Sequence, residues 1–426
     1  MGKSRATPFR RKTLPDVTIL WSWAEFAVRW LHVTAAIAWI GSSFYFIALD
    51  LGLRKTPDLP PGAGGEEWQV HGGGFYHIRK YLVAPERLPE HLTWFKWESY
   101  TTWLSGFAVL VLVYYLGADL FLVDPGVLTM PARVAIAISL GSLGLGWLAY
   151  DRICKSAFGN DNTRLMILLY VMLVAMAWGY SQVFSGRAAL LHLGAITATV
   201  MTANVFLVII PNQKIVVGDL KAGRVPDAKY GRIAKQRSTH NNYLTLPVLF
   251  LMLSNHYPLA FASRWNWVIA SLVFLMGVTI RHYFNSFHAS THPRKGPLWT
   301  WGATALLFAA IVWLSMAPLY GEDEGWEEGA LAPSRQRFAE AEGFDAAVEV
   351  VINNCSMCHA PRPAWPGLGW PPRDVKLVTA SDVARHAEQI SLQAGVTHAM
   401  PPGSANFMDA GDRAVLVEWY RNARDG

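Results

Sequence analysis

The sequence predicts an all-α membrane protein, a bundle of about eight transmembrane helices followed by a small soluble C-terminal domain. Two features of the 426-residue chain predict this fold class: hydrophobic residues make up 52% of it, including 19 Trp, and long apolar runs recur along its first three quarters. Both are typical of membrane proteins. The net charge of +6 comes from short basic clusters between the apolar runs, which argues against nucleic-acid binding.

Four segments follow from the changes in composition. Residues 1–22 form a basic tail without a small-residue cleavage site, so we expect it to be uncleaved. Residues 23–320 form the transmembrane domain, residues 321–333 an acidic linker, and residues 334–426 a soluble domain.

Apolar stretches long enough to cross a bilayer define the expected spans. They begin near Trp23, Tyr100, Ala132, Arg164, Arg187, Asn242, Trp265 and Leu298. The stretch from Asn242 is the shortest and contains Pro247, so the alternative is a re-entrant segment, which would change the number of spans by one.

The loop charges predict the orientation of these spans. Lys and Arg concentrate in the segments Leu51–Ser99, Asp151–Thr163, Asn212–Asn241 and Arg281–Pro297. Because cytoplasmic loops are enriched in basic residues, these connections are expected inside, and the C-terminal domain is expected in the periplasm of a bacterium, attached to its inner membrane. The basic N-terminal tail is the one exception.

The first and fifth spans share a pattern that suggests a four-plus-four repeat. Leu31-His32-Val33-Thr34-Ala35-Ala36 resembles Leu191-His192-Leu193-Gly194-Ala195-Ile196. A parallel repeat would place His32 and His192 at the same depth. Chance similarity between apolar helices is the alternative.

Cys355-Ser356-Met357-Cys358-His359 has the spacing of a covalent c-type haem site. Two thiols attach the vinyl groups and the adjacent histidine binds the iron. We expect Met400, which precedes Pro401-Pro402-Gly403, to be the second iron ligand, with His398 and His386 as rivals. A structural zinc site would need a further ligand pair that the sequence does not supply.

Other histidines form an outer and an inner layer within the apolar region. Buried ionisable groups in membranes are usually functional, and His32 and His192 are candidates to hold a haem b that relays electrons across the bilayer. If the reducing substrate binds near the outer face, no second haem is needed. For each histidine, a simple interfacial hydrogen bond is the alternative.

Three stretches carry a resemblance to a known family: Gly72-Gly73-Gly74-Phe75-Tyr76-His77-Ile78-Arg79-Lys80-Tyr81, Trp94-Phe95-Lys96-Trp97-Glu98-Ser99-Tyr100 and His240-Asn241-Asn242-Tyr243-Leu244-Thr245-Leu246-Pro247. Together with the C-terminal haem motif, they resemble the PuuD family of membrane-bound urate oxidases fused to cytochrome c. The resemblance implies oxidation of urate to 5-hydroxyisourate, with electrons leaving through the haem to a soluble cytochrome c or a terminal oxidase rather than to hydrogen peroxide.

Residue roles follow from what this chemistry requires. Urate is anionic, so Arg79 or Arg281 can pair with it through a planar guanidinium. Asn241 and Asn242 can bind its amide edges, and Phe75 or Tyr76 can stack on it. His77, His240 or Glu98 can act as the base.

The alternatives to these roles are membrane-surface anchoring for Arg79 and helix capping for the two asparagines. Two other functions compete with urate oxidation. One is a quinol- or metal-linked electron-transfer subunit, and the other is a haem-dependent sensor or transporter of a purine.

Overall fold

The structure is a computed structural model that describes residues 17–82, 89–290, 295–316, 331–366, 368, 370–402 and 408–425. Most of the predicted linker and of the N-terminal tail lies outside these residues, as do His292 and residues 403–407.

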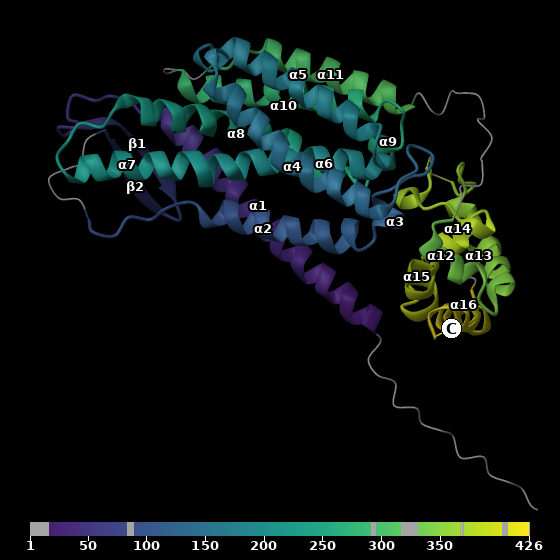
Figure 1. The fold of residues 1–426 in the computed structure, drawn as a ribbon. Helices are drawn as coiled ribbons and strands as arrows, with labels where there is room; N and C mark the ends of the chain where they lie inside the picture. The colour runs from purple at the N-terminus through teal and green to yellow at the C-terminus, as the bar shows by residue number, and fades with distance from the viewer. Residues whose placement is uncertain are drawn as a thin grey trace, which may run out of the picture.

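Long helices lie side by side in one bundle (Figure 1). Their bounds are α1 Val17–Gly52, α2 Trp97–Leu110 with the π-helical η1 Val111–Tyr115, α4 Ala132–Lys155, α5 Asn162–Ser181, α6 Gly186–Ala203, the π-helical η3 Asn204–Ile209, α7 Ile210–Lys221, α8 Ala228–Ser254, α10 Asn266–Ala289 and α11 Trp299–Met316. The short helices α3 Ala118–Phe121, η2 Ala157–Asn160 and α9 Pro258–Phe261 connect them.

Six helical segments within the described residues are long and apolar enough to cross a membrane: α1, α4, α5, the continuous α6–η3–α7, α10 and α11. The bundle also exposes large apolar side chains, such as Trp23 at 65% and Trp30 at 68%. A soluble protein would bury such residues, whereas lipid accepts them. The chain is therefore compatible with a multi-pass membrane protein.

Two helices differ from their predicted bounds. α1 begins at Val17, six residues before the predicted domain boundary. α8 begins at Ala228 rather than near Asn242, and Asp227 caps it by accepting a hydrogen bond from the Lys229 backbone. The first half of α8 is charged, so apolar content alone does not reveal that it is helical.

The prediction of an all-α fold is wrong in one place. β1 (Ala63–His71) and β2 (Gly74–Tyr81) form an antiparallel hairpin. Gly72 and Gly73 make its turn with φ of 58° and 80°, a region that glycine enters without a steric penalty. The stretch from Gly72 to Tyr81, expected as a simple loop, is thus the turn and second strand of this hairpin.

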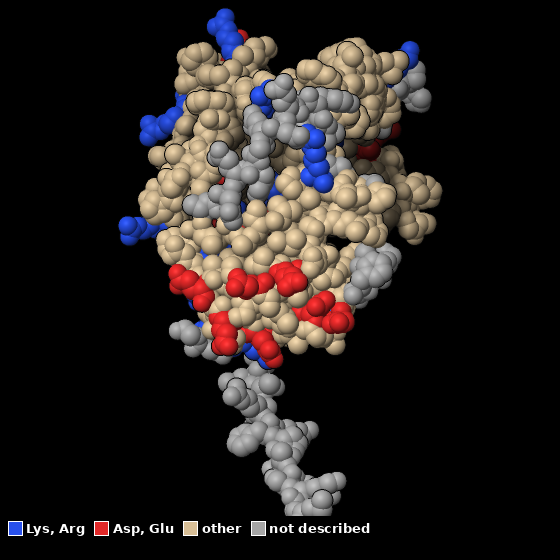
Figure 2. Space-filling model, turned by 90° about the vertical axis from the view of Figure 1, so that its right-hand side faces the viewer, with Lys and Arg blue, Asp and Glu red and all other residues tan. Residues whose placement is uncertain are grey.

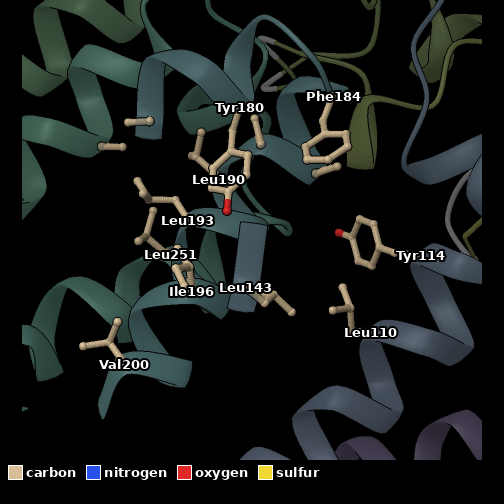
Figure 3. Close-up of a cluster of buried hydrophobic side chains, with 14 of the residues drawn as sticks. Leu110, Tyr114, Leu143, Tyr180, Phe184, Leu190, Leu193, Ile196, Val200 and Leu251 are labelled. Carbon is tan, nitrogen blue, oxygen red and sulfur yellow. The ribbon is translucent and has the colours of Figure 1, made fainter. Parts of the chain in front are cut away.

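The bundle core lies around α6. Leu193 and Ile196 of α6 pack with Leu251 of α8, Tyr180 of α5 and Phe184 from the turn between α5 and α6 (Figure 3). Pro247 in α8 meets Gly277 in α10, where a Cβ would lie 2.6 Å from the proline Cδ. Glycine at this point lets α8 and α10 approach closely, which positions the polar residues described below.

The C-terminal residues fold around a separate hydrophobic core centred on Trp419. Its elements are α12 Pro333–Ala339, α13 Phe344–His359, η5 Pro372–Asp374, α14 Ala380–Arg385, α15 Ala387–Ile390, the π-helical η6 Ser391–Val396 and α16 Ala410–Asp425. The domain lies at the α3 and α9 end of the bundle, and the hairpin lies at the opposite end (Figure 1). Asp and Glu side chains gather on its outward side (Figure 2). This face is therefore acidic, although the net charge of the whole chain is +6.

Candidate functional site

α8 carries three consecutive buried polar side chains in the middle of the bundle. His240, Asn241 and Asn242 are 5%, 6% and 0% exposed. Because residues two apart on an α-helix are about 200° apart around its axis, His240 and Asn242 face opposite sides of α8. They belong to two separate polar clusters.

The first, which we call the tyrosine cluster, lies between α4, η3 and α8. Asn204 Nδ2 donates to the Tyr150 hydroxyl at 2.9 Å and to Asn241 Oδ1 at 3.0 Å. The Tyr150 hydroxyl lies 2.8 Å from His240 Nδ1, and Asn241 Nδ2 donates to the Met201 carbonyl at 2.9 Å.

An ion pair closes the tyrosine cluster. Arg237 Nη2 lies 2.8 Å from Asp151 Oδ1, with the two side chains 2% and 7% exposed. Its guanidinium sits 4.8 Å from the Tyr150 ring centroid, and Nη1 donates to Asn204 Oδ1 at 3.4 Å. Lys155 also pairs with Asp151, at 2.7 Å. The buried charge of Arg237 is therefore compensated.

The bond from Arg237 fixes which atom of Asn204 donates. Arg237 can only donate, so Asn204 accepts through Oδ1 and donates through Nδ2. The Tyr150 hydroxyl accepts from Asn204 and can either donate to His240 Nδ1 or accept from it. When Tyr150 donates, the proton of His240 lies on Nε2, which makes that nitrogen a hydrogen-bond donor toward a ligand.

The second cluster, which we call the arginine cluster, lies between α1, α8 and α10. Arg281 is 7% exposed and donates from Nε to Asn242 Oδ1 at 3.3 Å and from Nη2 to Asn285 Oδ1 at 3.1 Å. The Phe44 ring centroid lies 4.2 Å from its guanidinium carbon. Among the described residues, no carboxylate pairs with Arg281, and Asn242 Nδ2 has no hydrogen-bond partner. This cluster therefore holds an uncompensated buried cation and a free amide donor.

His77 and Arg79, both predicted site residues, lie on the hairpin. Glu66 Oε2 accepts from His77 Nε2 at 2.7 Å and from Arg79 Nε at 3.0 Å, and Trp68 stacks on His77 at 4.1 Å. The hydrogen bond from Thr56, followed by those from His77 and Arg79, lowers the pKa of Glu66 to about 2. Arg79 therefore already has an anionic partner.

The remaining inner candidates are scattered. Glu98 lies in the first turn of α2, where its backbone carbonyl accepts from Thr102 at 2.6 Å, and it joins neither cluster. Phe75 and Tyr76 are 79% and 53% exposed on the hairpin. The structure thus brings Arg281 together with Asn242, and His240 with Asn241, but does not unite them with the hairpin.

A basic cleft opens beside the tyrosine cluster, at the end of the bundle opposite the C-terminal domain (Figure 1). Its empty volume is about 2570 Å³, and no Asp or Glu is among its lining residues. Arg232, Lys235, His240 and His282 are among the residues that line it. A cleft lined by one sign of charge concentrates ions of the opposite sign, so this opening favours small anions.

The histidine of the C-terminal Cys-Ser-Met-Cys-His motif is oriented by a backbone hydrogen bond. His359 Nδ1 donates to the Val375 carbonyl at 2.7 Å, which leaves Nε2 with its lone pair, the usual state of a metal-binding histidine. Cys355 and Cys358 lie in the last turns of α13. Burial lowers the pKa of His359 and raises that of Cys355 to about 11. These residues fit covalent haem attachment. No three His, Cys, Asp or Glu of the described residues form a metal-binding group.

Met400 is held by its backbone, with its side chain accessible. Its N–H donates to the Gln393 carbonyl at 2.9 Å, its carbonyl accepts from Arg413 at 3.0 Å, and it is 39% exposed. The rival His398 is exposed. His386 has an unpartnered Nδ1, and burial lowers its pKa to about 3.

The outer histidines give less support to a haem b. Both ring nitrogens of His192 are bonded, to the Ala188 carbonyl at 2.8 Å and Ser139 Oγ at 2.7 Å. His32 uses Nδ1, at 2.9 Å from the Thr102 carbonyl. These residues offer one free nitrogen rather than two, so they do not fit a bis-histidine haem, and we derive no step through such a group.

Described residues of the C-terminal domain contact the α3 and α9 end of the bundle. Ser334 Oγ donates to Asp119 Oδ2 at 2.5 Å. η5 packs on α9, and η5 directly precedes Val375, which holds the motif histidine. The segment that holds His359 is thereby tied to this end of the bundle.

Sequence reasoning missed several residues of both clusters: Phe44, Tyr150, Asp151, Asn204, Arg237 and Asn285. Asp151 and Asn204 carried a usable signal, since charged or amide side chains inside apolar segments are rare without a function or a partner. Phe44 and Asn285 carried none, because their roles depend on which helices pack together.

One comparison identifies similarity over most of the chain. The family model described as "Urate oxidase N-terminal" matches residues 18–315. No curated protein and no solved structure matches the chain.

Proposed function

The chain belongs to the urate oxidase N-terminal family, and we propose that it oxidises urate to 5-hydroxyisourate in the arginine cluster and passes the electrons to a haem c in its C-terminal domain. The family supports an oxidoreductase acting on urate. The location of the substrate and the path of the electrons are our proposals.

The observation that carries the proposal is the unpaired charge of Arg281. Burying a cation without a partner costs several kcal/mol, so a protein retains one where a ligand supplies the opposite charge. Urate is a planar anion, which suits the planar donor fork of arginine. Arg79 and Arg237, the competing arginines, are already paired with Glu66 and Asp151.

Neighbouring groups match the rest of the purine. Asn242 Nδ2, which has no partner, can donate to a urate carbonyl, and Phe44 lines the same cluster. The charge of Arg281 also lowers the pKa of a bound urate N–H, because an adjacent cation favours the more anionic form. A more anionic purine is easier to oxidise.

The basic cleft would concentrate urate at the bundle end where it opens, on the side of α8 opposite the arginine cluster. It opens at the bundle end opposite the C-terminal domain, which we assign to the cytoplasm of a bacterium, with the C-terminal domain in the periplasm. The first residues of α1 and the C-terminal domain lie at the same end of the bundle (Figure 1), as an even number of spans requires. Adding α2–η1 and α8 to the six apolar segments gives the eight spans that we propose.

In the C-terminal domain we propose Cys355 and Cys358 as the haem attachment points, with His359 and Met400 as iron ligands. A haem bound there would accept single electrons and transfer them to a soluble cytochrome c or a terminal oxidase. The packing of η5 on α9 would keep it next to the outer end of the bundle.

The test is an anaerobic absorbance spectrum of the purified full-length protein before and after addition of urate. We expect urate to reduce a c-type α-band, with 5-hydroxyisourate as product, and Arg281→Met to lower kcat/KM at least about a hundredfold, since two charge-assisted hydrogen bonds contribute about 1.5–3 kcal/mol each. Arg164→Met, at an exposed arginine paired with Asp161, is the control. Reduction by quinol but not by urate would instead identify an electron-transfer subunit.

A further inference from the structure

A second pocket, which we call the apolar pocket, lies between the helices on the His240 side of α8. No charged side chain is among its lining residues. The wall includes Met166, Met172, Met176, Ile196 and Phe274. Such a wall suits a flexible apolar ligand, since methionine adapts to irregular shapes.

One end of this pocket is polar. His240 and Tyr243 line both the apolar pocket and the basic cleft, so they mark the boundary between the two spaces. His240 Nε2 has no hydrogen-bond partner among the described residues, and it is a donor in the tautomer in which Tyr150 donates to Nδ1 at 2.8 Å. The pocket thus offers a hydrogen-bond donor at the head of an apolar channel.

Urate does not suit this pocket. It carries polar atoms around its whole edge, and an apolar wall would leave most of them without hydrogen bonds, at about 1–3 kcal/mol for each group. A ligand for this space needs a carbonyl acceptor at one end and an apolar body at the other. α5 forms one wall of the pocket, and the face of α5 that points away from the pocket exposes Val171 at 56%. A single helix therefore separates the pocket from the lipid.

We propose that the apolar pocket binds a membrane quinone, with a ring carbonyl accepting from His240 Nε2–H and the isoprenoid chain along the methionine-rich wall. The proposal rests on the proposed function only for its electron source. Urate and water would give 5-hydroxyisourate, two electrons and two protons, and the quinone would take up all four to form the quinol. Reoxidation of the quinol would release the two protons and supply the two electrons, one at a time, to the proposed haem c. A two-electron acceptor would then lie across α8, a helix about 10 Å wide, from the arginine cluster.

The test measures binding of decylubiquinone to the full-length protein in nanodiscs, without urate. We expect Leu173→Trp, which fills the pocket, to weaken binding at least tenfold, and His240→Phe to weaken it about tenfold through loss of one hydrogen bond. Val171→Trp, on the outward face of the same helix, should bind normally. A thermal unfolding transition like that of the wild type shows that a variant is folded. If Leu173→Trp does not fold, Met172→Trp replaces it as the pocket-filling variant.

Equal binding by the wild type and by the folded pocket-filled variant would overturn the proposal. So would a phospholipid retained in the pocket that excess decylubiquinone does not displace. If decylubiquinone binds as expected and urate reduces nothing, only the proposed function fails.

Discussion

Two buried arginines on neighbouring helices have opposite electrostatic surroundings. Arg237 on α8 is 2% exposed and pairs with Asp151, whereas Arg281 on α10 is 7% exposed and, among the described residues, contacts neutral amides and a phenylalanine ring but no carboxylate. Burial alone therefore does not distinguish a structural cation from a ligand-binding one. The presence or absence of a built-in anion does.

The largest expected effect separates the two arginines by stability. Arg237→Met leaves Asp151 buried beside Lys155 alone and should lower the free energy of unfolding by about 3–5 kcal/mol. Arg281→Met removes an unpaired cation and should leave stability unchanged or higher. Thermal unfolding of both variants in one detergent measures the two stability changes. Equal destabilisation would show that the two arginines do not differ as proposed.

Substrate should sharpen the same contrast. Urate at about 100 times its Kd should stabilise the wild type by about 2.7 kcal/mol, because it supplies the anion that Arg281 lacks. The Arg281→Met protein should show no shift in Tm. A neutral purine such as hypoxanthine serves as the ligand control, and an equal shift in the variant would place urate elsewhere.

The close contact between α8 and α10 can be tested by substitution. Gly277→Ala puts a methyl group 2.6 Å from the Pro247 Cδ, which should cost about 1–3 kcal/mol and raise KM for urate by separating Asn242 from Arg281. Gly302→Ala in α11, where no atom lies within 4 Å of the added Cβ, is the matched control. An unchanged KM in a destabilised Gly277→Ala protein would argue that this contact does not set the site.

The sequence predicted much of the fold but little of how its polar residues pair. Hydrophobic length predicted where the helices lie, because lipid forces the backbone into helices. It missed the hairpin, whose Gly72-Gly73 turn signal lies in a polar loop where no membrane constraint applies. It gave Arg281 and Asn242 the same status as His77 and Arg79, as candidates for the urate site. The ion pairs that separate these residues, with Glu66 or Asp151, depend on tertiary contacts that the sequence does not show. The haem motif was readable because its five residues are contiguous.

The hairpin should respond to pH through Glu66. Its folded pKa of about 2 lies below the unfolded value of about 4.3, so its stabilisation is complete above the unfolded pKa and is lost as pH falls from about 5 toward 2. Hydrogen exchange of residues 63–81, corrected for the intrinsic pH dependence, should accelerate over that range. Glu66→Gln should be insensitive to pH there, and a wild-type hairpin that stays protected at pH 2 would contradict the assignment.

The smallest effect should come from Arg79. Its guanidinium is 36% exposed and already neutralised by Glu66, and such pairs contribute about 0.2–1 kcal/mol. Arg79→Gln should therefore change kcat/KM for urate less than about threefold, while loosening the hairpin slightly. Steady-state kinetics of Arg79→Gln and Arg281→Met, measured together, decide which of the two arginines binds urate. If Arg79→Gln caused the larger loss, urate would bind at the hairpin, and the unpaired charge of Arg281 would need another ligand.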